Sequence, residues 1–359
     1  MKIKTRRNIM KRIGIMGAGA LGTILGAYIT KSGRDVLLID AYKEHVDALN
    51  NHGAKVIGED NLVVPVKACT PDEMEGFFDI VFYITKAPAN SVALPQLLPH
   101  LNESSVVCVL QNGLPEGPVA EYVGKDRVVG GTVNWGGGLQ GPGVSHSTVS
   151  AKARADNAFE IGELDGKKTD RIMEISDILS VMGKVHVLDN FSGARWAKLF
   201  VNATYSGLSA ALGCSYGDIL DDEFAFKVST YAANEVVKAA RLNGIRIIDE
   251  YNGQDIKKAE FDTELERLEA AKVVIGVFDR FRLVNASMLN DMRRGIWNVE
   301  IDQINGSVVT EGEKMGLDTP FHRKIVELVK RACSTRTLPT WENLKEFREL
   351  VKNAEKIYQ

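Results

Sequence analysis

Short apolar runs alternate with stretches of helical periodicity through the first third of the chain. Compact runs rich in β-branched and aliphatic residues predict strands over residues 12–16, 36–39, 79–84 and 105–110. Apolar positions recur at helical spacing between them, which predicts helices over residues 21–31, 42–50 and 90–101. Strands that alternate with helices build βαβ units, so the pattern predicts a parallel sheet covered by helices.

The pattern changes twice further along the chain. From residue 128 to residue 162, short alternating runs and glycine-rich turns predict antiparallel strands added to the edge of the sheet, and a helix over 170–182 and a strand over 185–188 follow. Helical periodicity then dominates residues 194–212, 222–243, 255–283, 288–316 and 320–332, before a charged tail from Trp341. We therefore expect an α/β protein with two domains: an N-terminal Rossmann-type doubly wound sheet over residues 10–189 and an all-α domain over residues 190–359.

Composition narrows the class of protein. The 359 residues are 45% hydrophobic and 25% charged, which suits two globular domains. The formal net charge is −3 and no dense stripe of Lys and Arg stands out, so no nucleic-acid partner is expected. The chain has no apolar run of about 18 residues and no secretory signal, so we expect no membrane partner and a cytoplasmic location. The four cysteines are scattered without metal-ligand spacing, so no metal site is expected. Met10 offers an alternative start, so the first nine residues are left out of the expected fold.

A glycine-rich turn joins the first predicted strand to the first predicted helix. It reads Gly17, Ala18, Gly19, Ala20, Leu21, Gly22, the GxGxxG pattern of dinucleotide-binding folds. The first glycine permits the tight turn, the second lets the backbone approach a pyrophosphate, and the third lets helix and strand pack closely. Because strand, turn and helix agree, the sequence predicts a dinucleotide site here rather than an ordinary glycine-rich turn.

An acidic residue closes the second predicted strand. Asp40 lies 18 residues after Gly22, where a carboxylate accepts hydrogen bonds from the ribose hydroxyls of NAD and repels the 2′-phosphate of NADP. The nearest basic residues are Lys43 and His45. Asp40 therefore favours NAD(H), although an aspartate here also suits the cap of the following helix.

Two later strands also end in polar residues. Lys86 follows the strand over 79–84, and Asn112 follows the strand over 105–110. Doubly wound sheets bind ligands at this edge, so both side chains are candidates for contacts with cofactor or substrate. The alternatives are a solvated lysine and an asparagine that forms a turn before Gly113.

The first helix of the second half carries an unusual polar stripe. Lys198, Asn202 and Ser206 recur every four residues among mostly apolar neighbours, so a regular α-helix would place them on one face. Partial burial would lower the pKa of the Lys198 amine and make it a usable proton donor, whereas a snorkelling lysine is the structural alternative. Glu300 lies at the margin of another apolar stripe, where it either pairs with a lysine or is an ordinary helix-surface acid.

These segments together resemble the ketopantoate reductase (2-dehydropantoate 2-reductase) family from about residue 11 to residue 331. The resemblance is carried by seven ordered motifs: the glycine turn 17–22, Thr85-Lys86, Gln111-Asn112-Gly113, Pro142-Gly143 followed by 161–163, 196–199 with Asn202, 287–291, and Glu300-Ile301-Asp302 with Ile304-Asn305-Gly306. The resemblance implies a Rossmann domain joined to a helical domain, and reduction of a 2-oxo acid to the (R)-2-hydroxy acid with NADP(H) on the route to pantothenate and coenzyme A.

The resemblance also implies a role for each candidate. Lys198 would be the general acid and Glu300 would hold it, with Lys86, Asn112 and Glu300 contacting the cofactor. The small 2-oxo acid substrate would be bound by four polar residues: Asn112, Asn202, Ser206 and Ser287.

This chain departs from the family in places that leave other functions open. Ser206-Gly207 stands where the family often has Asn-Pro, and Asp40 stands where NADP-using members place a basic residue. The alternatives are a D-2-hydroxyacid dehydrogenase acting on other branched 2-oxo acids such as 2-oxoisovalerate, and a non-catalytic cofactor sensor. A homodimer through the helical domain is a further expectation.

Overall fold

The computed structural model describes residues 11–251 and 253–359, and its contacts divide the chain into two compact units. One unit holds the chain up to Gln111 together with Pro115–Phe191, and the other holds Asn112–Leu114 together with Ser192–Gln359. The domain boundary expected after residue 189 lies two residues before the division that follows Phe191. The first nine residues, which were left out of the expected fold, lie outside the residues that the structure describes.

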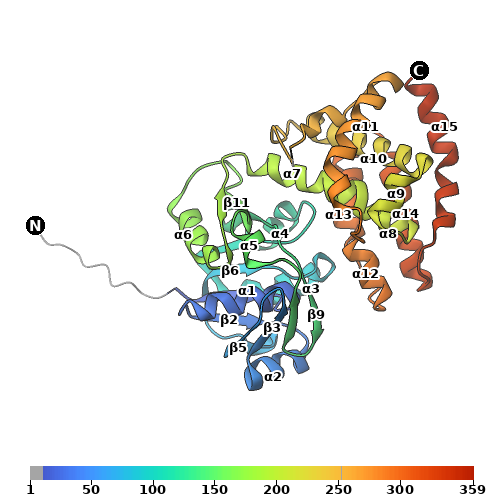
Figure 1. The fold of residues 1–359 in the computed structure, drawn as a ribbon. Helices are drawn as coiled ribbons and strands as arrows, with labels where there is room; N and C mark the ends of the chain where they lie inside the picture. The colour runs from blue at the N-terminus through green and yellow to red at the C-terminus, as the bar shows by residue number, and fades with distance from the viewer. Residues whose placement is uncertain (1–10, 252) are drawn as a thin grey trace, which may run out of the picture. The chain divides into compact units, whose positions relative to one another are not determined.

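The first unit, drawn in blue to green in Figure 1, is built on an eight-stranded sheet with the order β12-β11-β8-β7-β6-β1-β2-β5. Every neighbouring pair is parallel except β11 and β8, which are antiparallel. The strands are β1 (Ile13–Met16), β2 (Val36–Ile39), β5 (Lys67–Cys69), β6 (Phe78–Tyr83), β7 (Leu101–Val109), β8 (Val128–Val133), β11 (Phe159–Gly162) and β12 (Val185–Val187). The chain runs outward in both directions from β1, so the strand order reverses between β1 and β6, which is where doubly wound sheets bind ligands.

Helices cover both faces of this sheet, as the sequence predicts. Helices α1 (Ala20–Lys31) and α6 (Asp170–Leu179) share one buried apolar cluster with alternate residues of the central strands. Helices α3 (Asn90–Leu97) and α4 (Glu116–Val123) share a second cluster on the other face. Residues Phe82 and Val81 of β6 belong to opposite clusters, because successive side chains of a strand point to opposite faces.

A second, four-stranded sheet corrects the expected arrangement of residues 128–162. Only β11 is an antiparallel addition to the main sheet. The hairpin β9 (Gly137–Gly141) and β10 (Val144–Ser147) instead joins β3 (Ala54–Gly58) and β4 (Leu62–Val64) in the order β4-β3-β10-β9, packed on α1. Strands β3, β4 and β5 are absent from the sequence prediction, because they are short and β3 pairs with a strand nearly ninety residues away. Helix α2 (Lys43–His52) precedes β3, and the short α5 (Ala151–Arg154) follows β10.

The second unit is helical throughout its main elements. They are α7 (Phe191–Val201), a π turn (Asn202–Ser206), α8 (Gly207–Leu212), α9 (Tyr216–Asp221), α10 (Glu223–Leu242), α11 (Glu264–Phe278), α12 (Ser287–Arg293), α13 (Ile301–Lys314), α14 (Pro320–Thr335) and α15 (Arg348–Ile357). The helix expected over 288–316 is two helices, because the chain turns at Gly295 with a φ of +80°. The expected helix over 255–283 contains α11 with a short 3₁₀ turn on either side, and the charged tail forms a 3₁₀ turn and α15.

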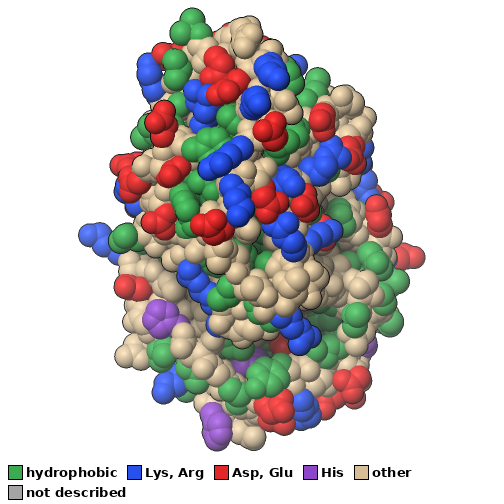
Figure 2. All heavy atoms as spheres, turned by 90° about the vertical axis from the view of Figure 1, so that its right-hand side faces the viewer, with side chains coloured by type: hydrophobic (Ala, Val, Ile, Leu, Met, Phe, Trp, Pro, Cys, Tyr) green, Lys and Arg blue, Asp and Glu red, His purple; other side chains and the backbone are tan. Residues whose placement is uncertain are grey.

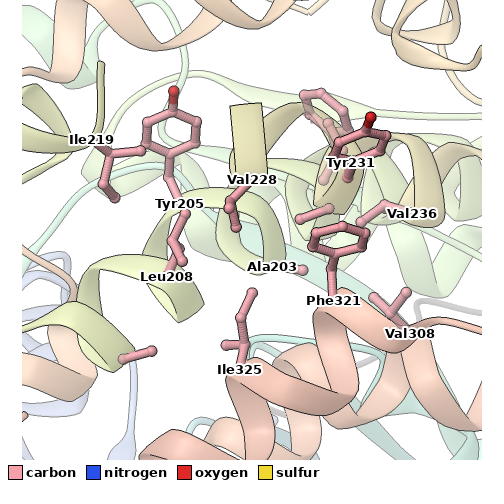
Figure 3. Close-up of a cluster of buried hydrophobic side chains, with 14 of the residues drawn as sticks. Ala203, Tyr205, Leu208, Ile219, Val228, Tyr231, Val236, Val308, Phe321 and Ile325 are labelled. Atoms are coloured by element: carbon pink, nitrogen blue, oxygen red, sulfur yellow. The ribbon is translucent and has the colours of Figure 1, made fainter. Parts of the chain in front are cut away.

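Aromatic and aliphatic side chains fill the core of the helical unit. Figure 3 shows Tyr205 and Ala203 from the π turn in the same cluster as Val308 of α13 and Phe321 of α14. Tyr205 stacks on Phe278 with ring centroids 3.7 Å apart. This packing fixes the π turn between α10, α13 and α8.

The described surface mixes charges of both signs. On the face in Figure 2, Lys and Arg side chains are interspersed with Asp and Glu side chains rather than gathered in one basic patch. Among the described residues, every helix is too short or too polar to cross a bilayer.

Candidate functional site

The glycine turn has the geometry that its pattern predicts. Gly17 has a φ of +100°, and a Cβ there would lie 2.6 Å from the backbone nitrogen of Thr85. A Cβ at Gly22 would lie 2.1 Å from the carbonyl oxygen of Gly17, so helix and strand approach more closely than any side chain allows. By contrast, nothing lies within 4 Å of a Cβ built at Gly19, so the second glycine faces open space.

The N-terminus of α1 suits an anionic ligand. Gly19 is the N-cap and provides no side-chain cap, and the first turn contains no acidic residue. The free N–H groups of a first helical turn and the helix dipole both favour a negative charge at this point. The residues Gly17, Ala18, Gly19, Ala20, Leu21 and Gly22 therefore fit the pyrophosphate of a dinucleotide.

Asp40 follows directly after β2, and the structure shows a second task for its carboxylate. Asp40 Oδ1 accepts a hydrogen bond from the backbone N–H of Tyr42 at 3.0 Å, so the side chain also shapes the turn before α2. The two basic residues considered near Asp40 are both engaged elsewhere. Lys43 pairs with Asp47, and His45 is fully buried.

His45 is a positioning residue that the sequence analysis missed. Its Nε2 lies 2.7 Å from the carbonyl oxygen of Ala18, in the glycine turn, and its Nδ1 accepts the backbone N–H of Gly143 at 3.0 Å. Thr23 donates to the same Ala18 carbonyl at 2.6 Å. Because Nδ1 is the acceptor, the proton of the neutral ring lies on Nε2 and points at Ala18. His45 therefore ties the glycine turn to the β9–β10 hairpin.

Residues after β6 and β7 are held together by a buried amide. Gln111 Nε2 donates to the carbonyl oxygen of Thr85 and to Asn90 Oδ1, at 2.8 Å in both cases. Lys86 follows Thr85 with an exposed side chain, and Gly17 packs against the backbone of Thr85. The contacts therefore place Lys86 next to the glycine turn, at the point where the strand order reverses.

The helix that carries Lys198 is not a regular α-helix. Lys198 and Asn202 are both half-buried, but a π turn begins at Asn202. The Gly207 N–H bonds to the carbonyl of Asn202, five residues back, which shifts the positions after it by one residue. The stripe expected for a regular helix is therefore interrupted at Ser206, which is buried with its Oγ 2.5 Å from the Tyr216 hydroxyl.

Glu300 and Asn112 belong to the same unit as Lys198. Glu300 is buried and is the N-cap residue of α13, the helix that packs against the π turn. Gly113 has a φ of +82°, and a Cβ there would lie 1.9 Å from the carbonyl oxygen of Gln303, so the chain passes close to the first turn of α13. This contact places Asn112 near the same end of α13 as Glu300.

Ser287 is the first residue of α12 and is exposed. The residue before it, Ala286, donates its backbone N–H to Ser209 Oγ at 3.2 Å, which ties the start of α12 to α8. The helical unit thus provides five of the candidate residues: Asn112, Lys198, Asn202, Ser287 and Glu300.

One further buried polar residue has a signal in the sequence. Asn305 lies in the motif Ile304-Asn305-Gly306, among the apolar positions Ile301, Ile304 and Val308, whereas the residues around His45 give no sign of its buried contacts. A polar residue at a core position of an otherwise apolar helix face signals a buried hydrogen-bond partner, and Asn305 fits that signal.

Comparisons with known proteins identify the family of the chain. The family models described as ketopantoate reductase PanE/ApbA and ketopantoate reductase PanE/ApbA C terminal match residues 13–166 and 190–332. The 2-dehydropantoate 2-reductase of Streptococcus pyogenes is 29% identical over 322 residues, 88% of this chain and 95% of its own. That of Lactococcus lactis is 30% identical over 325 residues, 89% of this chain and 96% of its own.

Solved structures include two close in fold. A ternary complex of D-mandelate dehydrogenase with NADH and anilino(oxo)acetate is 25% identical with a TM-score of 0.76, and covers 90% of this chain and 99% of its own. A PanE/ApbA family ketopantoate reductase from Ralstonia eutropha is 25% identical with a TM-score of 0.75, at the same coverage.

Proposed function

Because the chain belongs to the ketopantoate reductase family, whose members are NAD(P)-dependent oxidoreductases acting on CH–OH groups, we propose that it reduces 2-dehydropantoate (ketopantoate) to (R)-pantoate. The product would serve pantothenate and coenzyme A biosynthesis. The observation that carries the proposal is the half-buried Lys198 one turn before Asn202, on a helix where Ala197 and Leu199 on either side of the lysine are buried.

Residues 17–22 would hold the dinucleotide, and its dihydronicotinamide would supply the hydride that the substrate's carbonyl carbon needs. Lys198 Nζ donates a proton to the carbonyl oxygen, and its positive charge stabilises the alkoxide that develops there. Glu300 holds the lysine and the nascent hydroxyl. Lys86 and Asn112 line the nicotinamide side.

The remaining candidates orient the substrate. Asn202 binds its hydroxyl end, and Ser287, the exposed first residue of α12, binds its carboxylate. Ser206, whose Oγ lies 2.5 Å from the Tyr216 hydroxyl, contacts the same end of the substrate from the π turn.

For the cofactor we propose NAD(H). Asp40 presents a carboxylate where the 2′-phosphate of NADP would bring further negative charge, and Lys43 is paired with Asp47 while His45 is buried. The similar D-mandelate dehydrogenase is described with NADH.

A second candidate function is a D-2-hydroxyacid dehydrogenase that acts on other 2-oxo acids such as 2-oxoisovalerate. Two observations favour it: Ser206-Gly207 in place of the family's Asn-Pro, and the similarity to D-mandelate dehydrogenase. Ser206 is shorter than asparagine and its Oγ already faces Tyr216, so it offers less to a substrate's hydroxyl end.

The deciding experiment measures oxidation of NADH and NADPH with three 2-oxo acids in parallel. They are ketopantoate, 2-oxoisovalerate and phenylglyoxylate, which is the 2-oxo acid that corresponds to mandelate. A higher kcat/KM for ketopantoate supports the first function. A preference of about tenfold for another acid, about 1.4 kcal/mol of transition-state discrimination, establishes the second. No turnover of any acid would favour a cofactor sensor.

A lysine substitution tests the assignment of the proton donor. Lys198→Ala should lower kcat by about 10²–10⁴ with NADH binding preserved, because it removes general acid catalysis alone. Lys352→Ala, which removes an exposed lysine of α15, is the matched control. Undiminished turnover in Lys198→Ala would show that another group donates the proton.

A further inference from the structure

The π turn between α7 and α8 leaves one backbone carbonyl without its usual donor. In an α-helix the Gly207 N–H would bond to the carbonyl of Ala203, four residues back. Here it bonds to Asn202 instead. A buried carbonyl that loses its partner costs free energy unless another group donates to it.

Asn305 of α13 provides that donor. Its side chain is fully buried, and Nδ2 lies 2.8 Å from the Ala203 carbonyl oxygen. A carbonyl only accepts hydrogen bonds, so the atom facing Ala203 must be the amide nitrogen.

The second amide hydrogen of Asn305 is also used. Nδ2 lies 2.9 Å from His322 Nδ1, and His322 Nε2 lies 3.0 Å from the carbonyl oxygen of Ala232. Since that carbonyl only accepts, Nε2 carries the ring proton and Nδ1 accepts from Asn305. Helix α14 therefore fixes the carboxamide from the other side.

Gly207 makes room for this contact. A Cβ at Gly207 would lie 2.2 Å from Asn305 Oδ1 and 2.4 Å from Nδ2. Oδ1 itself has no hydrogen-bond partner among the described residues. The amide thus leaves its oxygen unsatisfied while both of its hydrogens are used, which indicates that the two donated bonds decide its placement.

From these contacts we infer that Asn305 is a positioning residue, which holds the π turn and thereby sets the direction of the Lys198–Asn202 face relative to Glu300. Asn305 and Glu300 lie on consecutive turns at the start of α13, so one short helical segment provides both the carboxylate and the support of the lysine helix. The catalytic consequence rests on the proposed function, whereas the hold on the π turn does not.

The first test compares two variants of α13. Asn305→Leu keeps the approximate size but donates no hydrogen bond, and Val308→Ala removes a buried contact of the same helix without a polar group. We expect both to lower Tm. Only Asn305→Leu should lower kcat/KM for the 2-oxo acid, by at least about tenfold, because a small misplacement of the reacting groups slows the reaction strongly. The Kd for NADH, measured by fluorescence, should stay unchanged.

The second test uses Gly207→Ala, alone and with Asn305→Ala. Gly207→Ala displaces the carboxamide, so it should lower kcat/KM as Asn305→Leu does. In the double variant the new methyl group occupies the space that Asn305 vacates. Gly207→Ala should therefore destabilise the Asn305→Ala protein less than it destabilises the protein that keeps Asn305, while activity stays low in both. Additive stability losses would overturn the proposed contact.

Amide hydrogen exchange separates this inference from the proposed function. In Asn305→Leu, exchange over residues 202–208 should rise above that in Val308→Ala of similar Tm, whichever acid is the substrate. Equal exchange together with an unchanged kcat/KM would refute the inference. If the unmodified protein turns over no 2-oxo acid, the proposed function fails and the exchange comparison alone decides whether Asn305 holds the π turn.

Discussion

Acidification should selectively remove the stability that His322 provides. The ring is fully buried and donates from Nε2 to Ala232 while Nδ1 accepts from Asn305. Burial lowers the pKa of His322 from 6.5 to about 4, so the folded protein holds the ring neutral. The unfolded chain binds a proton more readily, so the stability is fully present above pH 6.5 and is lost as the pH falls toward 4.

The size of the effect follows from the two pKa values. The difference between 6.5 and about 4 corresponds to about 3 kcal/mol in full, and about 2 kcal/mol of it is lost between about pH 7.5 and about pH 5. Glu235 acts in the opposite direction. It accepts the backbone N–H groups of Phe321 and His322, and burial raises the pKa of its carboxyl to about 8, so its contribution to stability grows as the pH falls from 8 toward 4.5.

A variant comparison isolates the histidine, because the Glu235 contribution cancels. Urea unfolding at the two pH values is followed by tryptophan fluorescence, since Trp196, Trp297 and Trp341 lie in the helical unit and only Trp135 lies in the other. His322→Gln cannot titrate, so its cost relative to the unmodified protein should shrink by about 2 kcal/mol on acidification.

The control is His52→Gln, which replaces an exposed histidine of α2. Its effect on the free energy of unfolding should be small at both pH values. If the cost of His322→Gln is the same at both pH values, the ring is not held neutral by burial and the reasoning is wrong.

Three further predictions concern the first unit. Asp40→Asn keeps the acceptor for the Tyr42 N–H but removes the charge, so the ratio of kcat/KM for NADPH to that for NADH should rise about tenfold, or about 1.4 kcal/mol. His45→Leu removes a hydrogen bond worth about 1 kcal/mol from the glycine turn, so the Kd for NADH should rise about fivefold in a fluorescence titration. Arg154→Met leaves Asp60 buried without its two-pronged partner at 2.7 and 2.9 Å, so urea unfolding should show a loss of about 3–5 kcal/mol.

Two of these predictions have a matched variant, and each has an outcome that would contradict it. Asp35→Asn removes an exposed acid of the same unit and should leave the cofactor ratio unchanged, while an unchanged ratio in Asp40→Asn would exclude Asp40 as the determinant. For the histidine, a Kd for NADH equal to that of the unmodified protein would contradict its hold on the glycine turn. For the ion pair, Arg154→Met with Asp60→Leu should be more stable than Arg154→Met alone, because the buried charge is gone.

Local patterns in the sequence determined the architecture and the cofactor motif. The glycine turn, the strands β1, β2, β6 and β7 and the long helices depend on residues close in the chain, so apolar periodicity and glycine spacing were enough to predict them. Lys198 and Asn202 were recognisable for the same reason, since polar residues stand out one turn apart among apolar neighbours. The ketopantoate reductase family was identified from motifs of this local kind, and the comparisons confirm it.

Only the tertiary structure decided features that depend on distant partners. Strands β3 and β10 pair across nearly ninety residues, and no local pattern encodes that pairing. The π turn interrupts the polar stripe at Ser206 because Asn305, about a hundred residues later, satisfies the Ala203 carbonyl that the turn leaves open. His45, which the sequence shows only as a basic residue near Asp40, is likewise a buried support in the fold, because its environment comes from Ala18 and Gly143 rather than from its neighbours in the chain. A hydrogen bond depends on the position of both partners, and the fold alone sets the distance between residues far apart in sequence.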